Sequence, residues 1–408
     1  MNITEQVEYL MQGTEYGDES TQKTMAEELR ERLIEAERTG RRLKVYCGYD
    51  PRKPDLHLGH TVTMRKLRQF QEFGHEVTFV IGTYTSLIGD PSDQDKLRNI
   101  LTPQEAEENA QTYAEQAFRI LDRSQTRVRY NAEWLASLTL ADIIRLASNF
   151  TIQQFLTREA FRTRWDRGDA IYLHETFYSI MQGYDAYTLE ADVQVGGTDQ
   201  LFNILTAARK VMATLGARPN IAIILGILPG TDGVVKMSKS LGNHIPISTT
   251  PEDMYGKTMC IPDFAMSGYC RLVTRWTPSQ IAGFEQDIQV GKIHPRDAKM
   301  MLAYEITATF YGQEAADQAQ AGFIHLFQHH EPPPDLPDFQ LQPGMTVLDV
   351  LVATGLTGSR GEGRRLLDQH GVRLDSRPLS DPNQPFPQPG ILQAGKRKFV
   401  RVNGVSSQ

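Results

Sequence analysis

Cysteine is scarce in this chain, and the few cysteines are not arranged as pairs. Cys47, Cys260 and Cys270 are the only 3 in 408 residues; their number is odd and their spacing is wide. This pattern argues against a disulfide framework and against a cysteine-based zinc site. We therefore expect a reducing compartment and a cytoplasmic protein.

Long apolar runs are also missing. The longest, Ile221 to Leu228, is far shorter than the roughly 20 residues that a helix needs to cross a bilayer, so it is predicted to be a buried strand. The opening residues are polar and acidic and lack the basic start and apolar stretch of a targeting peptide. No membrane association is expected.

An excess of positive charge is missing as well, since 43 Lys and Arg face 50 Asp and Glu, for a net charge of -7. This balance argues against a surface built for nonspecific nucleic-acid binding, DNA included. Basic residues instead gather near the C-terminus. They are Arg360, Arg364, Arg365, Arg373, Arg377, Lys396, Arg397, Lys398 and Arg401. Any RNA contact is therefore predicted to be local.

The first part of the chain reads as a βαβ unit. Residues 43–49 are rich in β-branched and aromatic residues, apolar positions recur at helical spacing from Leu58 to Gly74, and residues 77–81 form a second strand. This order predicts a parallel, doubly wound α/β sheet that binds ligands beyond the carboxyl ends of its strands. The loop at 50–60 lies in that position.

The length of the chain favours two or three domains. We predict a first domain over residues 1–229, a more helical one over 230–330, and a small α+β module over 345–408. Between the last two, residues 331–344 contain five prolines, the composition of a semi-rigid linker.

Two motifs have the residues expected for phosphate binding. His57-Leu58-Gly59-His60 begins a predicted helix, where free N–H groups favour an anion and Gly59 leaves room for a nucleotide. Two surface or capping histidines are the plain alternative, and zinc is disfavoured because no third ligand is indicated. The second motif is Lys236-Met237-Ser238-Lys239-Ser240, on a glycine-flanked loop. It is either a mobile cationic clamp for a polyphosphate or a solvated basic loop.

A third set of residues predicts a small polar pocket. Tyr178, Gln182 and Asp185 follow one another at spacings of four and three, so a helix would present them on one face. Paired glycines at 196 and 197 precede Asp199 and Gln200, and Asp90 lies at a predicted strand end. Core packing, a helix salt bridge and a simple turn are the alternatives for these positions.

The two loop motifs together resemble the class I aminoacyl-tRNA synthetases. With Tyr46, Asp50 and the third set, the chain is similar over nearly its whole length to the tyrosyl-tRNA synthetases of the bacterial type. The resemblance implies a Rossmann-like catalytic domain, a helical domain on the anticodon side, and ATP-dependent activation of L-tyrosine through an adenylate. It also implies Mg²⁺ carried by ATP with no protein metal site, a tRNA(Tyr) partner, and a homodimer.

The resemblance also implies residue roles. Tyr46 and Asp185 would bind the substrate phenol, Asp90, Tyr178 and Gln182 its ammonium, and Gln200 would lie near its carboxylate. Tyrosyl-tRNA synthetases are themselves the standard example of discrimination by such a site, and they favour tyrosine over phenylalanine by a factor of about 10⁵. For the nucleotide, His57 and His60 would face the phosphates, and Lys236 and Lys239 would follow the pyrophosphate. The remaining positions near the nucleotide would be Gly48, Asp50, Gly59, Thr63, Gly197 and Asp199.

Residues 347–402 resemble a small RNA-binding domain that is shared with a ribosomal protein. The implied RNA contacts are Arg360, Arg364, Arg365, Lys396, Arg397 and Lys398, with a solvated charged helix as the alternative. Further candidates, for the acceptor stem, are Arg158, Arg162, Arg164 and Arg167, for which a solvated helix face is the alternative.

Some positions depart from the family pattern. Arg52 stands where many relatives have a small hydroxyl residue, and the segment 93–98, which contains Lys96 and Arg98, is more acidic than expected. Three other functions stay open. Tyr46, Asp185 and the basic tail disfavour a tryptophanyl-tRNA synthetase, and an RNA-binding module is of no use to a small-molecule nucleotidyltransferase. The intact loop motifs count against a non-enzymatic RNA-binding paralogue.

Overall fold

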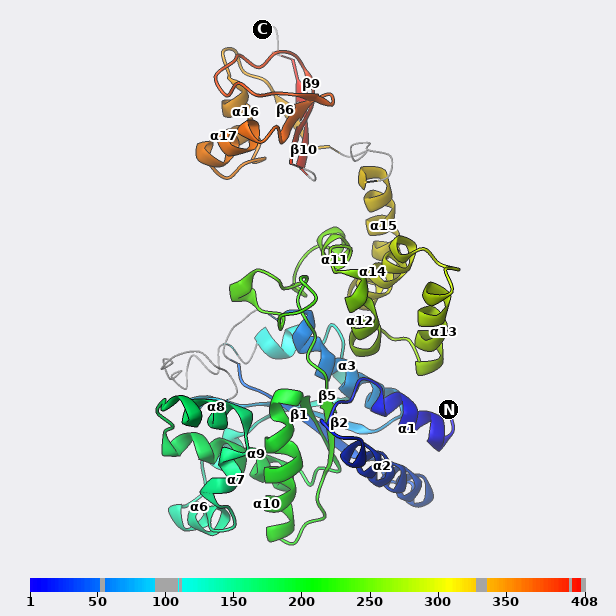
Figure 1. The fold of residues 1–408 in the computed structure, drawn as a ribbon, viewed down its shortest axis with the longest axis vertical. Helices are drawn as coiled ribbons and strands as arrows, with labels where there is room; N and C mark the ends of the chain where they lie inside the picture. The colour runs from blue at the N-terminus through cyan, green and yellow to red at the C-terminus, as the bar shows by residue number, and fades with distance from the viewer. Residues whose placement is uncertain (52–55, 92–108, 110–111, 328–335, 396–397, 405–408) are drawn as a thin grey trace. The chain divides into compact units, whose positions relative to one another are not determined.

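The computed structural model describes residues 1–51, 56–91, 109, 112–327, 336–395 and 398–404. The chain forms two compact units, Met1–Ala316 and Asp317–Gln408 (Figure 1). The predicted domain boundaries at 229, 330 and 344 stay predictions.

Unit 1 is built on a parallel sheet with the strand order β3-β2-β1-β4-β5. The strands are β1 Lys44–Tyr49, β2 Glu76–Ile81, β3 Thr126–Tyr130, β4 Val193–Gly197 and β5 Ile221–Leu225. This topology confirms the predicted doubly wound α/β fold. The strand order reverses between β1 and β4, and ligands of such sheets bind outside the carboxyl ends at this switch point.

Both faces of the sheet are covered by packed side chains. Successive side chains of a strand point to opposite faces, so each strand contributes to both layers. On β1, Val45 and Cys47 pack in the cluster that includes Leu67 and Phe70 of α3 (Leu58–Glu72). Tyr46 lies on the other face with Met181 of α9 (Leu173–Thr188). A single strand therefore separates the side chains that face α3 from one that faces α9.

Helix α9 begins with a capping box, in which Glu175 accepts a hydrogen bond from the backbone N–H of Tyr172. It packs very closely on the helical segment that follows β4. A Cβ at Gly183 would lie 2.8 Å from Cγ2 of Val211, so only glycine fits there. The predicted helical spacing of Tyr178, Gln182 and Asp185 is confirmed.

The remaining helices up to α10 lie around this sheet, and helices α11 to α14 form a separate group in unit 1 (Figure 1). Before β4 they are α1 Ile3–Met11, α2 Glu19–Thr39, α5 Ala132–Leu135, α6 Leu140–Ala147, α7 Ile152–Leu156 and α8 Glu159–Arg167. After β4 come a π-helical segment, Phe202–Ala208, and α10 Arg209–Thr214. The expected helical stretch from 251 to 327 is confirmed as α11 Pro251–Thr258, α12 Met266–Val273, α13 Pro278–Gln289, α14 Pro295–Tyr311 and α15 Gln313–Phe327.

The outer edge of β5 is covered by a short segment between α1 and α2. The backbone N–H of Glu15 donates to Ile224 O at 2.8 Å, and that of Gly226 donates to Gly13 O at 3.0 Å. The hydroxyl of Tyr16 donates to Ala222 O at 2.6 Å. Residues 13–16 therefore satisfy polar groups that a terminal strand would otherwise expose.

Unit 2 is an α+β structure, as predicted for the end of the chain. Its sheet has the order β6-β10-β9-β7-β8, formed by β6 Asp338–Gln340, β7 Val372–Leu374, β8 Arg377–Pro378, β9 Gly390–Ala394 and β10 Lys398–Asn403. Helices α16 Val347–Ala353 and α17 Arg360–Asp368 supply Val347, Leu351 and Leu367 to its core.

Along the described part of the whole chain, no helix is both long enough and apolar enough to cross a bilayer.

Candidate active site

Glycines at the switch point leave space for a ligand. At the end of β1, a Cβ on Gly48 would meet no atom within 4 Å. At the end of β4, a Cβ on Gly197 would lie 2.7 Å from Oδ1 of Asp199, so a larger residue would displace that carboxylate. The two predicted nucleotide positions, Gly48 and Gly197, thus lie at the carboxyl ends of the two central strands.

Helix α9 carries a buried carboxylate. Asp185 is 4% exposed, and it accepts hydrogen bonds from Trp134 Nε1 at 2.7 Å and from Asn131 Nδ2 at 3.3 Å. Burial raises the pKa of Asp185 to about 8, although these two donors lower it. Tyr46 is 2% exposed, and its hydroxyl donates to Gln182 O at 3.3 Å. Burial, and then the charge of Asp185, raise the pKa of Tyr46 well above its usual value.

A chain of hydrogen bonds connects Asp185 with Asp50 at the end of β1. Asn131 Nδ2 also donates to Thr85 Oγ1 at 3.0 Å, and Thr85 Oγ1 donates to Asp50 Oδ1 at 2.8 Å. The hydroxyl of Tyr178 donates to the other oxygen of Asp50 at 3.2 Å. The structure therefore brings Asp50, Tyr178 and Asp185 into one polar network.

Sequence reasoning missed four residues of this network: Gly82, Thr85, Asn131 and Trp134. Gly82 is required because a Cβ there would lie 2.1 Å from Oδ1 of Asp50. Asn131 comes directly after β3, at the same edge of the sheet as Asp50. The signal for Asn131 is its place directly after a third parallel strand, which the sequence pattern alone does not predict.

Asp90 and Gln200 also lie together. Asp90 accepts from Gln200 Nε2 and forms an ion pair with Arg158 at 2.5 Å. The Oε1 of Gln200 accepts from Asn203 Nδ2 at 2.8 Å. Oε1 of Gln182 is buried and has no hydrogen-bond partner among the residues that the structure describes.

The acceptor-stem interpretation of Arg158 is wrong. Its side chain is 4% exposed and is committed to Asp90, which leaves no surface for RNA. Arg164 pairs with Glu175 at 2.5 Å. Arg162 and Arg167 are exposed and stay candidates.

The histidine motif lies at the start of α3, where His57 is the N-cap residue. The rings of His57 and His60 are 3.8 Å apart, and Nδ1 of His60 accepts from the backbone N–H of His57 at 3.2 Å. A Cβ at Gly59 would lie 3.1 Å from the ring of His57 and 3.5 Å from Cβ of Met237. Gly59 therefore permits the lysine motif to approach the histidine motif closely.

The two motifs are joined through the backbone. Leu58 N–H donates to Ile245 O at 2.9 Å, and Ile247 N–H donates to Leu56 O at 3.2 Å. These bonds flank an antiparallel bridge between His57 and Pro246. The exit of the lysine loop is thereby fixed beside the first turn of α3.

The lysine loop is held at its base by Asn243. Asn243 Nδ2 donates to Asp232 Oδ2 at 2.6 Å, and its Oδ1 accepts from the backbone N–H of Ser238 at 2.8 Å. Lys236 pairs with Asp199 at 2.9 Å, although its side chain is 55% exposed. Lys239 is exposed and lines a pocket of about 150 Å³. The other lining residues are Leu56, His57, His244, Pro246 and Ser248.

The last predicted nucleotide residue, Thr63, lies one turn further along α3. Its hydroxyl is 2.7 Å from that of Tyr49 at the end of β1. The ring of Tyr49 stacks on Phe79 of β2, with centroids 4.4 Å apart. Thr63 is therefore held on the β1 side of the switch point.

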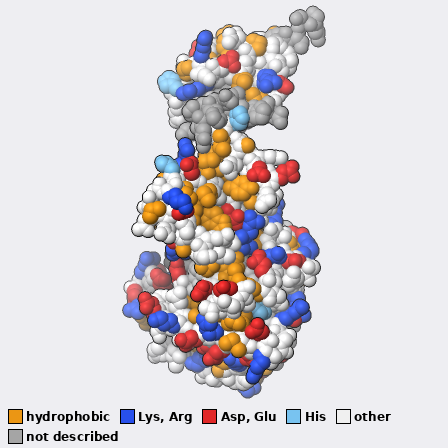
Figure 2. Space-filling model, turned by 90° about the vertical axis from the view of Figure 1, so that its right-hand side faces the viewer, with side chains coloured by type: hydrophobic (Ala, Val, Ile, Leu, Met, Phe, Trp, Pro, Cys, Tyr) orange, Lys and Arg blue, Asp and Glu red, His pale blue; other side chains and the backbone are white. Residues whose placement is uncertain are grey.

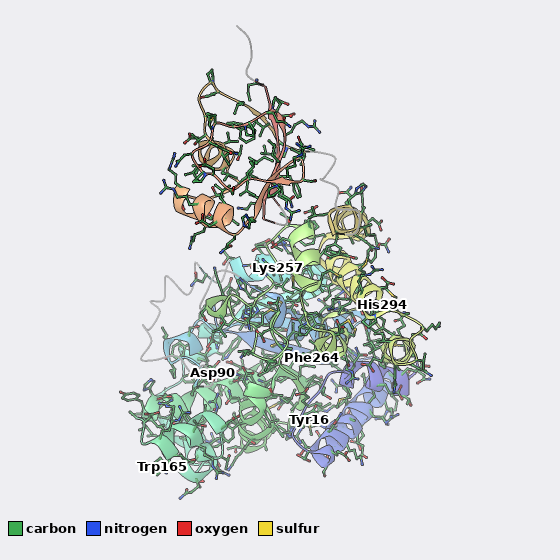
Figure 3. The ribbon with its side chains drawn as sticks, turned by 45° about the horizontal axis from the view of Figure 1, so that its top comes forward. Tyr16, Asp90, Trp165, Lys257, Phe264 and His294 are labelled. Carbon is green, nitrogen blue, oxygen red and sulfur yellow. The ribbon has the colours of Figure 1, made fainter. Side chains whose placement is uncertain are left out.

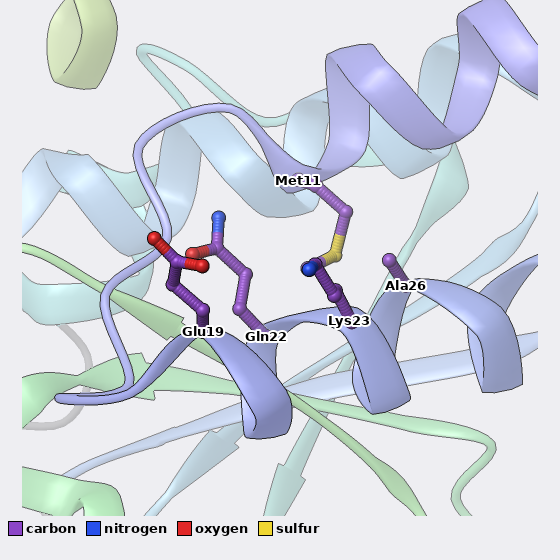
Figure 4. A pocket seen from close by; sticks show the side chains of 5 residues that line it. All are labelled: Met11, Glu19, Gln22, Lys23 and Ala26. Carbon is purple, nitrogen blue, oxygen red and sulfur yellow. The ribbon is translucent and has the colours of Figure 1, made fainter.

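A second, larger pocket contains none of the predicted site residues. It lies between α1 and α2 and is lined by Met11, Glu19, Gln22, Lys23 and Ala26 (Figure 4). Neighbouring positions of α2 supply both an acid and a base, so no single charge is favoured there. Within the described ranges, no group of three or more His, Cys, Asp or Glu is arranged to hold a metal ion.

The predicted RNA contacts belong to unit 2. Arg360 pairs with Asp349 at 2.6 Å, Lys398 Nζ donates to Leu356 O at 2.9 Å, and Arg364 and Arg365 are exposed on α17. Lys396 and Arg397 lie outside the described residues, as do Arg52 and the segment 93–98. Acidic and basic side chains are intermixed on the face drawn in Figure 2.

Comparisons with known proteins agree with this geometry. The family model described as "tRNA synthetases class I (W and Y)" matches residues 38–328. A tyrosine–tRNA ligase of Moorella thermoacetica is 46% identical over 380 residues, 92% of this chain and 92% of that protein. A tyrosine–tRNA ligase of Oleidesulfovibrio alaskensis is 42% identical over 98% of this chain and 99% of that protein.

Solved structures show the same fold at lower identity. A mitochondrial tyrosyl-tRNA synthetase of Aspergillus nidulans, truncated at its C-terminus, matches with a TM-score of 0.62 and 23% identity, over 79% of this chain and 94% of that one. A tyrosyl-tRNA synthetase of Archaeoglobus fulgidus, complexed with L-tyrosine, matches with a TM-score of 0.59 and 23% identity, over 78% of this chain and 100% of that one.

Proposed function

The chain belongs to the class I tRNA synthetases of the tryptophan and tyrosine family, and we propose that the site at the switch point performs its reaction as described below. The chain is an ATP-dependent tyrosine–tRNA ligase. Such an enzyme activates L-tyrosine to tyrosyl-adenylate with release of pyrophosphate. It then transfers the tyrosyl group to the 3′-terminal adenosine of tRNA(Tyr).

The observation that carries the assignment of the amino-acid pocket is the buried pair Tyr46 and Asp185. The two side chains lie on the α9 side of β1, and both groups are withdrawn from water. A substrate hydroxyl that enters here can form hydrogen bonds with both of them, whereas the ring of phenylalanine offers these buried groups neither a donor nor an acceptor. We therefore assign recognition of the phenol to Tyr46 and Asp185.

The ammonium group of tyrosine needs acceptors, and we assign three to it. The carboxylate of Asp90, the hydroxyl of Tyr178 and Oε1 of Gln182 are all acceptors. The amide oxygen is buried without a partner among the described residues. A buried unpaired acceptor costs about 1–3 kcal/mol, which an ammonium donor would recover. Gln200, hydrogen-bonded to Asp90, is proposed to lie near the substrate carboxylate.

ATP is proposed to lie over the carboxyl ends of β1 and β4, where Gly48 and Gly197 leave room for it. Asp50, Thr63 and Asp199 would contact its adenosine, while His57, Gly59 and His60 face its phosphates. The polar side chains around the phosphate pocket are two imidazoles, one lysine and one hydroxyl, which suit phosphate oxygens and not a bare cation. Mg²⁺ is therefore proposed to be carried by ATP, which agrees with its preference for phosphate and water ligands.

Activation of tyrosine needs no general base, because its carboxylate is ionised at neutral pH. The residues act by positioning and by charge stabilisation. Negative charge grows on the departing pyrophosphate, so donors from the start of α3 and from Lys236 and Lys239 are most effective when they bind that state better than ATP.

RNA binding and dimerisation belong to other surfaces. The tRNA is proposed to contact Arg360, Arg364, Arg365, Lys396, Arg397 and Lys398 of unit 2. A homodimer is proposed because large apolar side chains between 140 and 173 are exposed, among them Leu140 at 76% and Leu173 at 67%. Trp165, labelled in Figure 3, is 63% exposed. The three free cysteines fit the reducing environment of the cytoplasm, which is the proposed location.

Amino-acid-dependent ATP–pyrophosphate exchange without RNA tests the proposal. Tyrosine, tryptophan and phenylalanine are compared with the same enzyme. Exchange with tyrosine alone supports both adenylation and the assignment of the phenol pocket. Exchange driven by tryptophan would overturn the substrate, and no exchange at all would point to a non-enzymatic RNA-binding protein.

A further inference from the structure

We infer that His244 is a further positioning residue for the reaction, a third imidazole that binds the pyrophosphate part of ATP beside His57 and Lys239. This inference rests on the proposed function. His244 lies outside both sequence motifs, and its place in the site follows from the fold.

The first argument is position. The ring of His244 lies 6.2 Å from that of His57 at an angle of 63°, and the ring of His60 lies 3.8 Å beyond His57. His57, Lys239 and His244 line one pocket of about 150 Å³. His244 is therefore next to the residues that face the phosphates.

The second argument is charge. Among the described residues, no carboxylate lines this pocket, whose polar side chains are two imidazoles, a lysine and the hydroxyl of Ser248. The pocket also adjoins the start of the 15-residue helix α3, where the helix dipole favours an anion. An anion with several acceptor oxygens is the ligand class that these donors fit.

The third argument is rigidity. On one side of His244, Asn243 is 8% exposed and bonded to Asp232 and Ser238. On the other side, Ile245 and Ile247 are hydrogen-bonded to the segment Leu56–Leu58. His244 is thus fixed between two anchors, whereas Lys236 and Lys239 project from the exposed part of the loop.

The fixed position of His244 determines its expected kinetic role. A group that keeps its place binds ATP and the departing pyrophosphate about equally well, so its loss raises KM and leaves kcat almost unchanged. Loss of one hydrogen bond to a phosphate corresponds to about a fivefold to tenfold change. A lysine on the exposed loop, which can follow the leaving group, is expected to change kcat instead.

The test compares His244→Phe, which keeps a ring without donors, with His244→Gln, which keeps an N–H donor. Wild type and variants are measured in tyrosine-dependent exchange, with KM determined for ATP, pyrophosphate and tyrosine. His244→Phe is expected to raise KM for ATP and for pyrophosphate about fivefold to tenfold, with KM for tyrosine and kcat within about twofold. His244→Gln is expected to restore most of the loss. His370→Asn in unit 2, where φ is 54° and asparagine is tolerated, is the matched control.

Unchanged KM values for pyrophosphate in His244→Phe would overturn the inference and leave the proposed function standing. So would a parallel rise of all three KM values, which would show a packing defect. Absence of exchange in the wild type would overturn the proposed function, and this inference with it.

Discussion

The carboxylate of the amino-acid half of the site and the lysines of its phosphate half are held in opposite ways. In the amino-acid half, Asp185 is 4% exposed and fixed by Trp134 and Asn131. In the phosphate half, Lys236 is 55% exposed and Lys239 projects from the same loop. Selection of a substrate requires groups that are dehydrated and fixed before binding, whereas stabilisation of a departing anion requires groups that can move with it. The placement of the residues suggests which step each half serves.

Removal of the carboxylate should break the amino-acid half completely. Asp185→Ala leaves Trp134 Nε1 without its acceptor and removes a partner of the substrate phenol. We expect kcat/KM for tyrosine to fall by about 10³-fold or more, while the weak activity with phenylalanine changes little. ATP–pyrophosphate exchange with both amino acids measures this, with Asp287→Ala, which removes a partly exposed carboxylate, as control. An equal loss for both amino acids would locate the defect in catalysis or folding.

Removal of a lysine should affect the phosphate half alone. Lys239→Ala is expected to lower the rate of adenylate formation by about 10²-fold, because charge on the departing pyrophosphate loses a donor. The dissociation constant for tyrosine should stay within about twofold. Pre-steady-state kinetics and equilibrium tyrosine binding separate the two, with the surface variant Lys292→Ala as control. Equal losses of rate and of tyrosine binding would contradict the division between the halves.

A smaller change sharpens the amino-acid half. Trp134→Phe keeps an aromatic ring but removes the hydrogen bond to Asp185, so the carboxylate is less firmly held. KM for tyrosine should rise by about tenfold, as for the loss of one buried hydrogen bond, with KM for ATP unaffected. Steady-state exchange tests this against Trp165→Phe, which alters an exposed ring. A change in KM for ATP of the same size would show that Trp134 supports the whole fold.

The smallest expected effect is on stability. Burial raises the pKa of Asp185 from 3.8 to about 8, so between these values the folded protein holds a proton that the unfolded chain has released. The free energy of unfolding contributed by this group is therefore greatest below pH 4 and is lost as the pH rises towards 8. Asp185→Asn cannot titrate. Its thermal midpoint without ligands should fall less from pH 5 to pH 8 than that of the wild type, by about 2–4 °C. Calorimetry that gives equal slopes would contradict this origin.

The sequence predicts the features of the site that depend on neighbours along the chain. The strands and helix of the first βαβ unit follow from local periodicity, and the common face of Tyr178, Gln182 and Asp185 follows from helical spacing. Contacts across the fold do not follow. Trp134 and Asp185 are separated by 51 positions, and Arg158 and Asp90 by 68. No local pattern distinguishes a buried arginine that pairs with a distant aspartate from the exposed arginines beside it.

The proximity of His244 to His57 is a further example. It arises because the exit of the lysine loop forms a β-bridge with the residues before α3. Such a bridge needs only backbone groups, so the side chains on either side give little indication of it. Family resemblance identifies the two motifs, and the geometry of the fold adds a residue beside His57.

The short segment that covers β5 protects the protein against aggregation. The strand Ile221–Leu225 is entirely buried and apolar, and its outer edge is satisfied by Gly13 and Glu15 rather than by another long strand. An uncovered edge of this composition is a template on which a second chain can add a strand. Shortening the chain by its first sixteen residues would therefore expose this edge and make the protein prone to self-association. Tags and fusions are best joined where they do not pull this segment from the sheet.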